Sequence, residues 1–206
     1  MLIPAKSLPE AKSRLSGSTT DAAAHERLVL AIRADTVAAA RAADGVARIV
    51  VVLDRDGHPA QQRDLVFVQT QPGLNPALTE ADAYAAARWP HEGVAALVGD
   101  LPALRAEELA DALHQAAGFA RAFVADTSGA GTTLLTALPG HRLAPAFGTG
   151  SAARHAAGAT LLTGRSGLRQ DVDTETDLAE ALRLGVGPHT RAIAAPATRR
   201  VHIGQE

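Results

Sequence analysis

The sequence predicts a three-layer α/β fold, in which a mostly parallel sheet is flanked by helices. Short apolar runs bounded by Gly, Pro or charged residues are typical of strands covered on both faces. Segments with helical spacing lie between these runs, and the alternation indicates right-handed βαβ units. A chain of 206 residues with 47% hydrophobic content can bury one sizeable core, so we expect a single domain over residues 1–206.

Four apolar runs are predicted to form buried parallel strands. They cover residues 47–53, 65–70, 94–98 and 122–125. Leu2-Ile3 is predicted to form a very short first strand.

The longest predicted helix covers residues 21–43. The apolar residues that can share one of its faces are Leu28, Ile32, Val37 and Ala40. A second helix is expected over 104–117, with Gly118 as its C-cap.

Capping residues predict two more helices. Asn75 is a good N-cap and Pro76 is tolerated at the first helical position, so a helix opens there. Thr174 and Asp177 form the pattern of a capping box, and Gly185 ends the helix that follows.

Composition favours small ligands over nucleic acids and membranes. The net charge of -2 gives no basic footprint for a nucleic acid. No apolar run approaches the roughly 20 residues of a membrane span, and the N-terminus lacks the apolar segment of a signal peptide. The absence of Cys excludes disulfides and thiolate metal sites, which is compatible with the cytosol. Because no signal peptide is evident, we expect a cytoplasmic protein. Residues 190–206 show no clear period, and we expect this tail to be partly disordered.

Gly99-Asp100-Leu101-Pro102 directly follows the predicted strand 94–98. In open α/β sheets, ligands bind at the carboxyl edge, where such strands end. Asp100 is therefore expected at the functional edge of the sheet. The alternative is that Asp100 only caps the helix beginning near Pro102.

Asp171 and Asp173 alternate around Val172, so their carboxylates lie on one face if the segment is extended. Magnesium suits such a pair, because it takes one or two carboxylates together with water and substrate phosphates. Asp100 could supply a third carboxylate. The alternative is that Asp173 and Thr174 cap the next helix.

Lys6, Lys12 and Arg14 fall in one segment after the first predicted strand. Fixed cations at this edge would attract a polyphosphate, although a solvated surface would explain the charges as well. The sequence contains neither a Walker A pattern nor G-x-G-x-x-G.

Two glycine-rich segments could hold the phosphate or carboxylate of a second substrate. They are Gly129-Ala-Gly131-Thr132-Thr133 and Phe147-Gly148-Thr149-Gly150-Ser151, the latter ahead of a short helix. Arg154 and His155 could add charge there, or simply lie on an exposed helical face. No general base is evident, which suits a phosphate acceptor that arrives already ionised.

Taken together, these motifs resemble the guanylyltransferases of deazaflavin coenzyme F-420 biosynthesis from about residue 3 to residue 193. The motifs are Ile3-Pro4-x-Lys6, Ala11-Lys12-Ser13-Arg14-Leu15, Gly73-Leu74-Asn75, Gly99-Asp100-Leu101-Pro102, Phe147-Gly148, Ser151-Ala-Ala-Arg154-His155 and Asp171-Val172-Asp173-Thr174. The resemblance implies a nucleotide-diphospho-sugar transferase fold. It also implies transfer of the guanylyl group of GTP to a phosphorylated three-carbon acid, with release of pyrophosphate.

The chain is most similar to the actinobacterial branch of that family, for which the acid is phosphoenolpyruvate and the product enolpyruvyl-diphospho-guanosine. Use of 2-phospho-L-lactate or 3-phosphoglycerate is the alternative within this reaction. The resemblance also implies hand-over of the product to the next transferase of the pathway. Other classes left open are a metal-dependent glycosyltransferase and a non-catalytic GTP-binding module.

The resemblance assigns roles to individual residues. The residues that it assigns to phosphoenolpyruvate binding are Thr132, Gly148 and Ser151. The residues that it assigns to Mg²⁺ are Asp100, Asp171 and Asp173. Those for the guanine nucleotide and its triphosphate are Lys6, Lys12, Arg14, Asn75 and Gly99. We expect Asp100, Lys6 and Arg14 to be catalytic, the aspartate as a metal ligand and not as a proton carrier.

Overall fold

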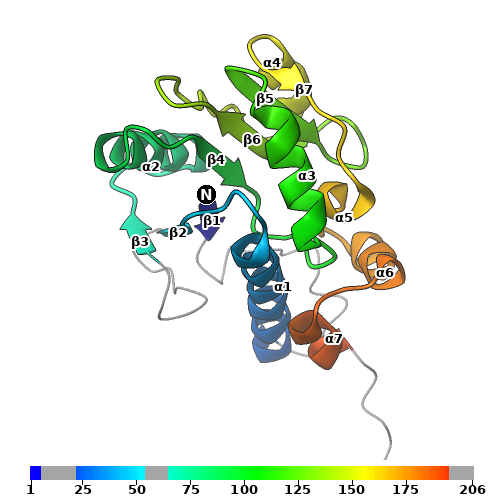
Figure 1. The fold of residues 1–206 in the computed structure, drawn as a ribbon. Helices are drawn as coiled ribbons and strands as arrows, with labels where there is room; N and C mark the ends of the chain where they lie inside the picture. Colours follow the sequence, from blue (N-terminus) through cyan, green and yellow to red (C-terminus); the bar gives the residue numbers. More distant parts are fainter. Residues whose placement is uncertain (6–21, 54–64, 195–206) are drawn as a thin grey trace, which may run out of the picture.

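A seven-stranded sheet forms the centre of the molecule in the computed structural model, which describes residues 1–5, 22–53 and 65–194 (Figure 1). The strands are β1 (Leu2–Ala5), β2 (Val50–Leu53), β3 (Leu65–Val68), β4 (Val94–Leu97), β5 (Arg121–Ala125), β6 (Thr132–Ala137) and β7 (Thr160–Leu161). Their order in the sheet is β3-β2-β1-β4-β6-β5-β7. β6 alone among them runs antiparallel to its neighbours, so the predicted mostly parallel sheet is confirmed.

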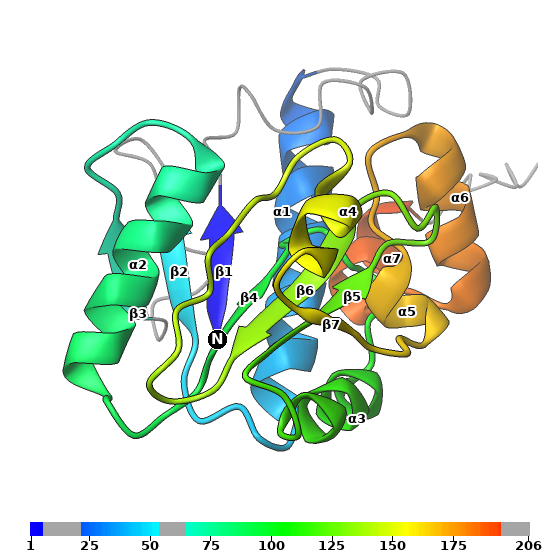
Figure 2. The same cartoon turned by 90° about the horizontal axis from the view of Figure 1, so that it is seen from above.

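Helices cover both faces of the sheet, as a three-layer fold requires. They are α1 (Ala22–Ala42), α2 (Leu74–Arg88), α3 (Ala106–Ala116), α4 (Ser151–Ala156), α5 (Ser166–Arg169), α6 (Glu175–Leu184) and α7 (Pro188–Ala194). One buried cluster joins the sheet to α1 and α3, and another joins the opposite face to α2 and α4. In Figure 2, α2 and α4 lie in front of the sheet and α1 lies behind it.

Neighbouring residues of the inner strands point to opposite faces of the sheet. Ile3 and Val51 pack into the cluster under α1 and α3, whereas Leu2 and Val50 pack into the cluster under α2 and α4. All four are at most 2% exposed. Parallel strands covered on both faces need apolar residues at every position, which explains their unbroken apolar runs.

The strand predicted over 65–70 forms, but the prediction that it is buried is wrong. β3 is an edge strand whose Leu65, Val66 and Val68 are 44–50% exposed. Its apolar residues resemble those of the inner strands, and only the sheet order places it at the border.

β6 is the main element that the sequence did not predict. Thr132, expected in a glycine-rich turn, is the first residue of this strand, and all six of its residues are buried. The turn from β5 is too short for a crossover helix, so the two strands form an antiparallel pair. Three threonines and no Val or Ile weaken the strand signal of this run.

The predicted long helix is confirmed as α1, and the four residues expected on its inner face are all buried. The capping box is also confirmed: Thr174 is the N-cap of α6, Asp177 is its partner, and Gly185 is the C-cap. The expected N-cap role of Asn75 is wrong, because Gly73 is the N-cap of α2.

Two other boundaries differ from expectation. Gly118 lies one residue beyond the C-cap of α3, which is Ala117. The tail expected to lack order from 190 is helical up to Ala194 in α7, and residues 195–206 lie outside the described residues. Over the described ranges of the chain, none of the helices combines the length and apolarity needed to cross a bilayer.

Candidate functional site

The sheet has a topological switch point between β1 and β4. Strands β2 and β3 extend the sheet on one side of β1, and the chain returns to its other side with β4. Ligands in open α/β folds bind in the crevice at the carboxyl ends of the strands at such a point. These ends are Ala5 of β1 and Leu97 of β4.

Gly99 brings the segment after β4 close to β1. A Cβ atom at Gly99 would lie 3.0 Å from the carbonyl oxygen of Pro4 and 3.5 Å from the Ile3 side chain. Glycine is therefore the residue that fits this approach. Asp100, which follows at once, lies at the carboxyl edge of the sheet, as the sequence predicted, and next to the switch point.

Two hydrogen bonds, one to a side chain and one between backbone groups, fix the residues around Asp100. The Leu101 amide donates to Thr36 Oγ1 of α1 at 2.9 Å, and the Val172 amide donates to the Asp100 carbonyl oxygen at 3.1 Å. The helix after this segment is α3, with Arg105 as N-cap, so the interpretation of Asp100 as a helix cap is wrong.

The acidic pair is thereby brought to the end of β4, although more than 70 residues of chain intervene. Val172 is fully buried in a cluster with Leu28 and Leu178, whereas Asp171 is half-buried and Asp173 is exposed. Thr174, and not Asp173, caps α6, so the acidic pair is not explained by capping.

The oxygen donors at this edge suit a hard cation, but they do not form a complete cage by themselves. In residues 1–5, 22–53 and 65–194, no group of three or more His, Cys, Asp or Glu side chains is arranged to hold a metal ion. Mg²⁺ commonly binds one or two carboxylates and completes its shell with water and substrate phosphates. Binding of Mg²⁺ by Asp100, Asp171 and Asp173, shared with a phosphorylated substrate, therefore stays a prediction.

Lys6, Lys12 and Arg14 lie outside the described residues. β1 ends at Ala5, immediately before Lys6, so the segment that carries these cations starts from the edge where Asp100 lies. Their contact with a triphosphate stays a prediction.

The three residues expected to hold the acid are linked by hydrogen bonds. Ser151 Oγ donates to Thr132 Oγ1 at 3.1 Å, and the Ser151 amide donates to the Gly148 carbonyl oxygen at 3.0 Å. The side chains of Thr132 and Ser151 are buried, whereas Gly148 is exposed and has a φ of 113°. Glycine tolerates this φ, and without a side chain its backbone is exposed.

His155 completes this network. The sequence named it only as a residue that could add charge or lie on an exposed helical face, and it is instead buried. Its Nδ1 lies 2.8 Å from Thr132 Oγ1, and its Nε2 accepts a hydrogen bond from the Ala146 amide at 2.9 Å. A backbone amide can only donate, so Nε2 carries no proton and Nδ1–H donates to Thr132. The sequence signal for this contact was the four-residue spacing of Ser151 and His155, which places both side chains on one face of a helix.

Burial keeps His155 neutral. The residue is 4% exposed, and its ring centroid lies 5.1 Å from that of Phe147. Desolvation, followed by repulsion from Arg154, lowers the pKa of His155 from 6.5 to about 4.

Helix α2 holds the loop that joins β6 to α4. The Asn75 side chain donates from Nδ2 to the Phe147 carbonyl at 3.1 Å and accepts from the Phe147 amide at 2.8 Å. Asp82, which is 1% exposed, accepts from the Leu143 amide and from Arg142. Asn75 thus positions the loop containing Gly148, and its expected contact with the nucleotide stays a prediction.

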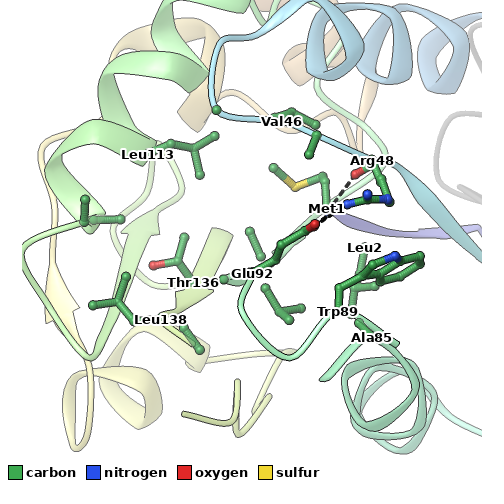
Figure 3. Close-up of a pocket in the computed structure, with 18 of the residues that line it drawn as sticks. Met1, Leu2, Val46, Arg48, Ala85, Trp89, Glu92, Leu113, Thr136 and Leu138 are labelled. Carbon is green, nitrogen blue, oxygen red and sulfur yellow. Dashed lines mark hydrogen bonds and ion pairs between the residues drawn. The ribbon is translucent and has the colours of Figure 1, made fainter. Parts of the chain in front are cut away.

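A cavity of about 390 Å³ lies at the opposite edge of the sheet (Figure 3). Val94, where β4 begins, contributes to its lining. The Arg48 guanidinium pairs with Glu92 and lies 5.0 Å from the centroid of the Trp89 ring. The cavity is therefore separate from the carboxyl edge that carries Asp100.

The fold of the chain is similar to that of solved structures with which it shares 17–18% sequence identity. A putative nucleotide-diphospho-sugar transferase from Desulfovibrio desulfuricans superposes with a TM-score of 0.69 over 92% of this chain and 88% of the other, at 17% identity. A Mycobacterium tuberculosis protein solved in complex with manganese superposes with a TM-score of 0.51 over 88% and 96% of the two chains, at 18% identity.

The family model "Guanylyl transferase CofC like" matches residues 1–195. A phosphoenolpyruvate guanylyltransferase from Geodermatophilus obscurus is 50% identical over 97% of this chain and 95% of the relative. The chain therefore belongs to the CofC-like guanylyltransferase family, which confirms the resemblance found in its motifs.

Proposed function

We propose that this chain transfers the guanylyl group of GTP to phosphoenolpyruvate, a step of coenzyme F-420 biosynthesis. Membership of the guanylyltransferase family supports the reaction type, and the name of the Geodermatophilus relative supports the acid. The products are enolpyruvyl-diphospho-guanosine and pyrophosphate, and the first of these passes to the next transferase of the pathway.

The observation that carries this proposal is the hydrogen bond from the Val172 amide to the Asp100 carbonyl. It joins the acidic pair to the end of β4, at the switch point where a nucleotide would bind. The start of β6 lies beside the end of β4, because the Val98 amide donates to the Thr133 carbonyl. There, hydrogen bonds connect Ser151 to both Thr132 and Gly148. The acid occupies this second region in the proposed complex.

In the proposed reaction, an anionic phosphate oxygen of phosphoenolpyruvate attacks the α-phosphorus of GTP in line. The bond from the α-phosphorus to the bridging oxygen breaks, and pyrophosphate leaves on the opposite side. The attacking oxygen carries no proton, so no side chain has to act as a general base. The residues of the chain bind and orient two anions.

Asp100, Asp171 and Asp173 are the proposed ligands of a divalent cation, which we take to be Mg²⁺. When bound, this ion neutralises charge on the reacting phosphates. Support comes from the oxygen donors at this edge and from the manganese complex of a protein with the same fold.

The test is release of pyrophosphate from GTP and Mg²⁺ with phosphoenolpyruvate, 2-phospho-L-lactate or 3-phosphoglycerate. We expect release with phosphoenolpyruvate and the highest kcat/KM for that acid. Preference for another acid would correct the substrate, and release of GDP from a nucleotide sugar would indicate a glycosyltransferase. GTP binding without turnover on any acid would contradict the proposal.

Arg14→Ala tests the role of the N-terminal cations. If Arg14 binds the triphosphate, its loss should raise the KM for GTP about tenfold and leave the KM for the acid nearly unchanged. Steady-state kinetics with each substrate varied in turn measures both constants. Equal changes in both would argue against a triphosphate role.

A further inference from the structure

The side chain of Arg154 is fixed across the loop that contains Gly148. Its Nε and Nη2 donate to the Ala146 carbonyl oxygen at 3.0 and 2.8 Å, and its Nη1 donates to the Thr149 carbonyl oxygen at 2.7 Å. Three hydrogen bonds to the backbone hold the guanidinium in one orientation although the residue is exposed. Little side-chain entropy would be lost if it bound a ligand.

The fixed guanidinium keeps unused hydrogen-bonding capacity. It has five N–H groups, of which the loop uses three, so one remains on each terminal nitrogen. No carboxylate among the described residues forms an ion pair with Arg154. Its positive charge is therefore not neutralised by this part of the chain.

Two glycines leave the guanidinium uncovered. Gly148 and Gly150 have φ values of 113° and 71°, and a Cβ atom at either would lie 3.7 Å from a terminal nitrogen of Arg154. Side chains at these positions would extend over the guanidinium. Their absence leaves room for a ligand beside it.

Arg154 is also connected to the buried network of the acid site. Ala146 accepts from Arg154 through its carbonyl and donates to His155 through its amide, and His155 bonds Thr132. The guanidinium of Arg154 is thus held directly by the backbone of Ala146, and the hydroxyl of Thr132 is connected to the same residue through His155. A small anion above Gly148 would meet a preformed positive group.

We infer that Arg154 binds an anionic oxygen, carboxylate or phosphate, of the phosphorylated acid and not of the nucleotide. This inference rests on the proposed function, because it assigns a partner within the proposed acid site. A guanidinium suits either group, since its planar N–H groups match two oxygens of a carboxylate or phosphate.

The first experiment compares Arg154→Gln and Arg154→Lys with the unchanged protein in the pyrophosphate assay. We expect Arg154→Gln to raise the KM for phosphoenolpyruvate at least tenfold and to change the KM for GTP less than twofold. Arg154→Lys keeps the positive charge but loses the paired N–H groups of the guanidinium. Its KM for the acid should therefore lie between those of the unchanged protein and Arg154→Gln. Arg183→Gln, which removes an exposed arginine paired with Glu180 on α6, is the control and should change neither constant.

The second experiment measures binding of phosphoenolpyruvate by calorimetry, with Mg²⁺ and without GTP. Weaker binding by Arg154→Gln at an unchanged melting temperature supports the inference. Absence of turnover in the unchanged protein would refute the proposed function, but it would leave this binding result and the inference standing. Equal binding by both proteins, or no binding by the unchanged protein, overturns the inference. Equal increases in both KM values with a lower melting temperature would show instead that Arg154 only stabilises the loop.

Discussion

The neighbours of His155 fix its protonation state. The Ala146 amide occupies Nε2, the hydrogen on Nδ1 points to Thr132, and burial lowers the pKa to about 4. At neutral pH the side chain is therefore an uncharged donor and cannot supply the positive charge that its sequence position suggested. The preceding residue, Arg154, carries the positive charge that acts on His155.

Replacement of His155 by phenylalanine should destabilise the protein. His155→Phe keeps an aromatic ring among apolar neighbours but leaves the half-buried Ala146 amide without its acceptor. It also removes one of the two donors to Thr132 Oγ1, while Ser151 still donates to this hydroxyl. We expect a loss of about 1–3 kcal/mol in the free energy of unfolding. Urea denaturation measures it, with His91→Phe at an exposed position as the control. Equal stabilities for the two variants would contradict the hydrogen-bond network.

Asp171 provides the sharpest test of the metal assignment. Asp171→Asn keeps the size of the side chain and removes the negative charge that a cation requires. Pyrophosphate release should fall on the order of 100-fold or more, with little change in melting temperature. Asp44→Asn, on a carboxylate whose side chain is 83% exposed, is the control. Full activity of Asp171→Asn would remove this residue from the site.

At the scale of elements, α2 acts as a support for the loop between β6 and α4. The Asn75 side chain makes two hydrogen bonds to the backbone of Phe147, and the side chain of Asp82, seven residues later on the same helix, accepts from the Leu143 amide. This loop carries Gly148, so the position of the proposed acid site depends on a helix that contributes no residue of its own to the buried network around Thr132.

A change at Asn75 should disturb this support. Asn75→Asp removes the Nδ2–H donor and places a carboxylate oxygen opposite the Phe147 carbonyl, where the two repel. We expect a loss of about 1–3 kcal/mol in stability and a KM for the acid that rises more than the KM for GTP. Melting curves and steady-state kinetics measure these effects.

Ala83→Asp adds the same charge on the exposed side of α2 and serves as the control. If Asn75 contacts the nucleotide directly, the KM for GTP should instead change most.

For the whole molecule, the order of the strands brings distant segments together. β1 and β4 are adjacent in the sheet although they are far apart in sequence, and the segment around Val172 adds to the same edge by bonding Asp100. The site therefore exists only when the sheet and the packing of α1 and α6 are complete.

Stability of the whole molecule should depend on pH through His155. Between its folded pKa of about 4 and its ordinary value of 6.5, the unfolded chain binds more protons than the folded one. The contribution of His155 to the free energy of unfolding is therefore highest above pH 6.5 and falls as pH decreases, by about 2 kcal/mol near pH 5. Urea unfolding at pH 7 and pH 5 measures this difference.

The variant His155→Gln isolates the contribution of this histidine from that of the carboxylates. It should lose less stability between pH 7 and pH 5 than the unchanged protein does. An identical loss in both would mean that other groups cause the dependence.

Much of the fold could be predicted from local patterns. Unbroken apolar runs indicated β2 and β4, spacing indicated α1, and the Thr174 capping box indicated the start of α6. Asp100 could be placed at a strand end for the same reason, since strand boundaries are local. β6 and the exposure of β3 could not be predicted, because both depend on which strands become neighbours.

The sequence by itself determined the fold class, the family motifs and the residue types of the site, because these follow from periodicity, capping and side-chain chemistry. Only the tertiary structure decided that the Val172 amide meets Asp100, that Asn75 supports Phe147, and that His155 is a buried neutral donor. Each of these depends on contacts between segments distant in sequence. Such contacts form through packing of the whole core, and no local pattern in the chain encodes them.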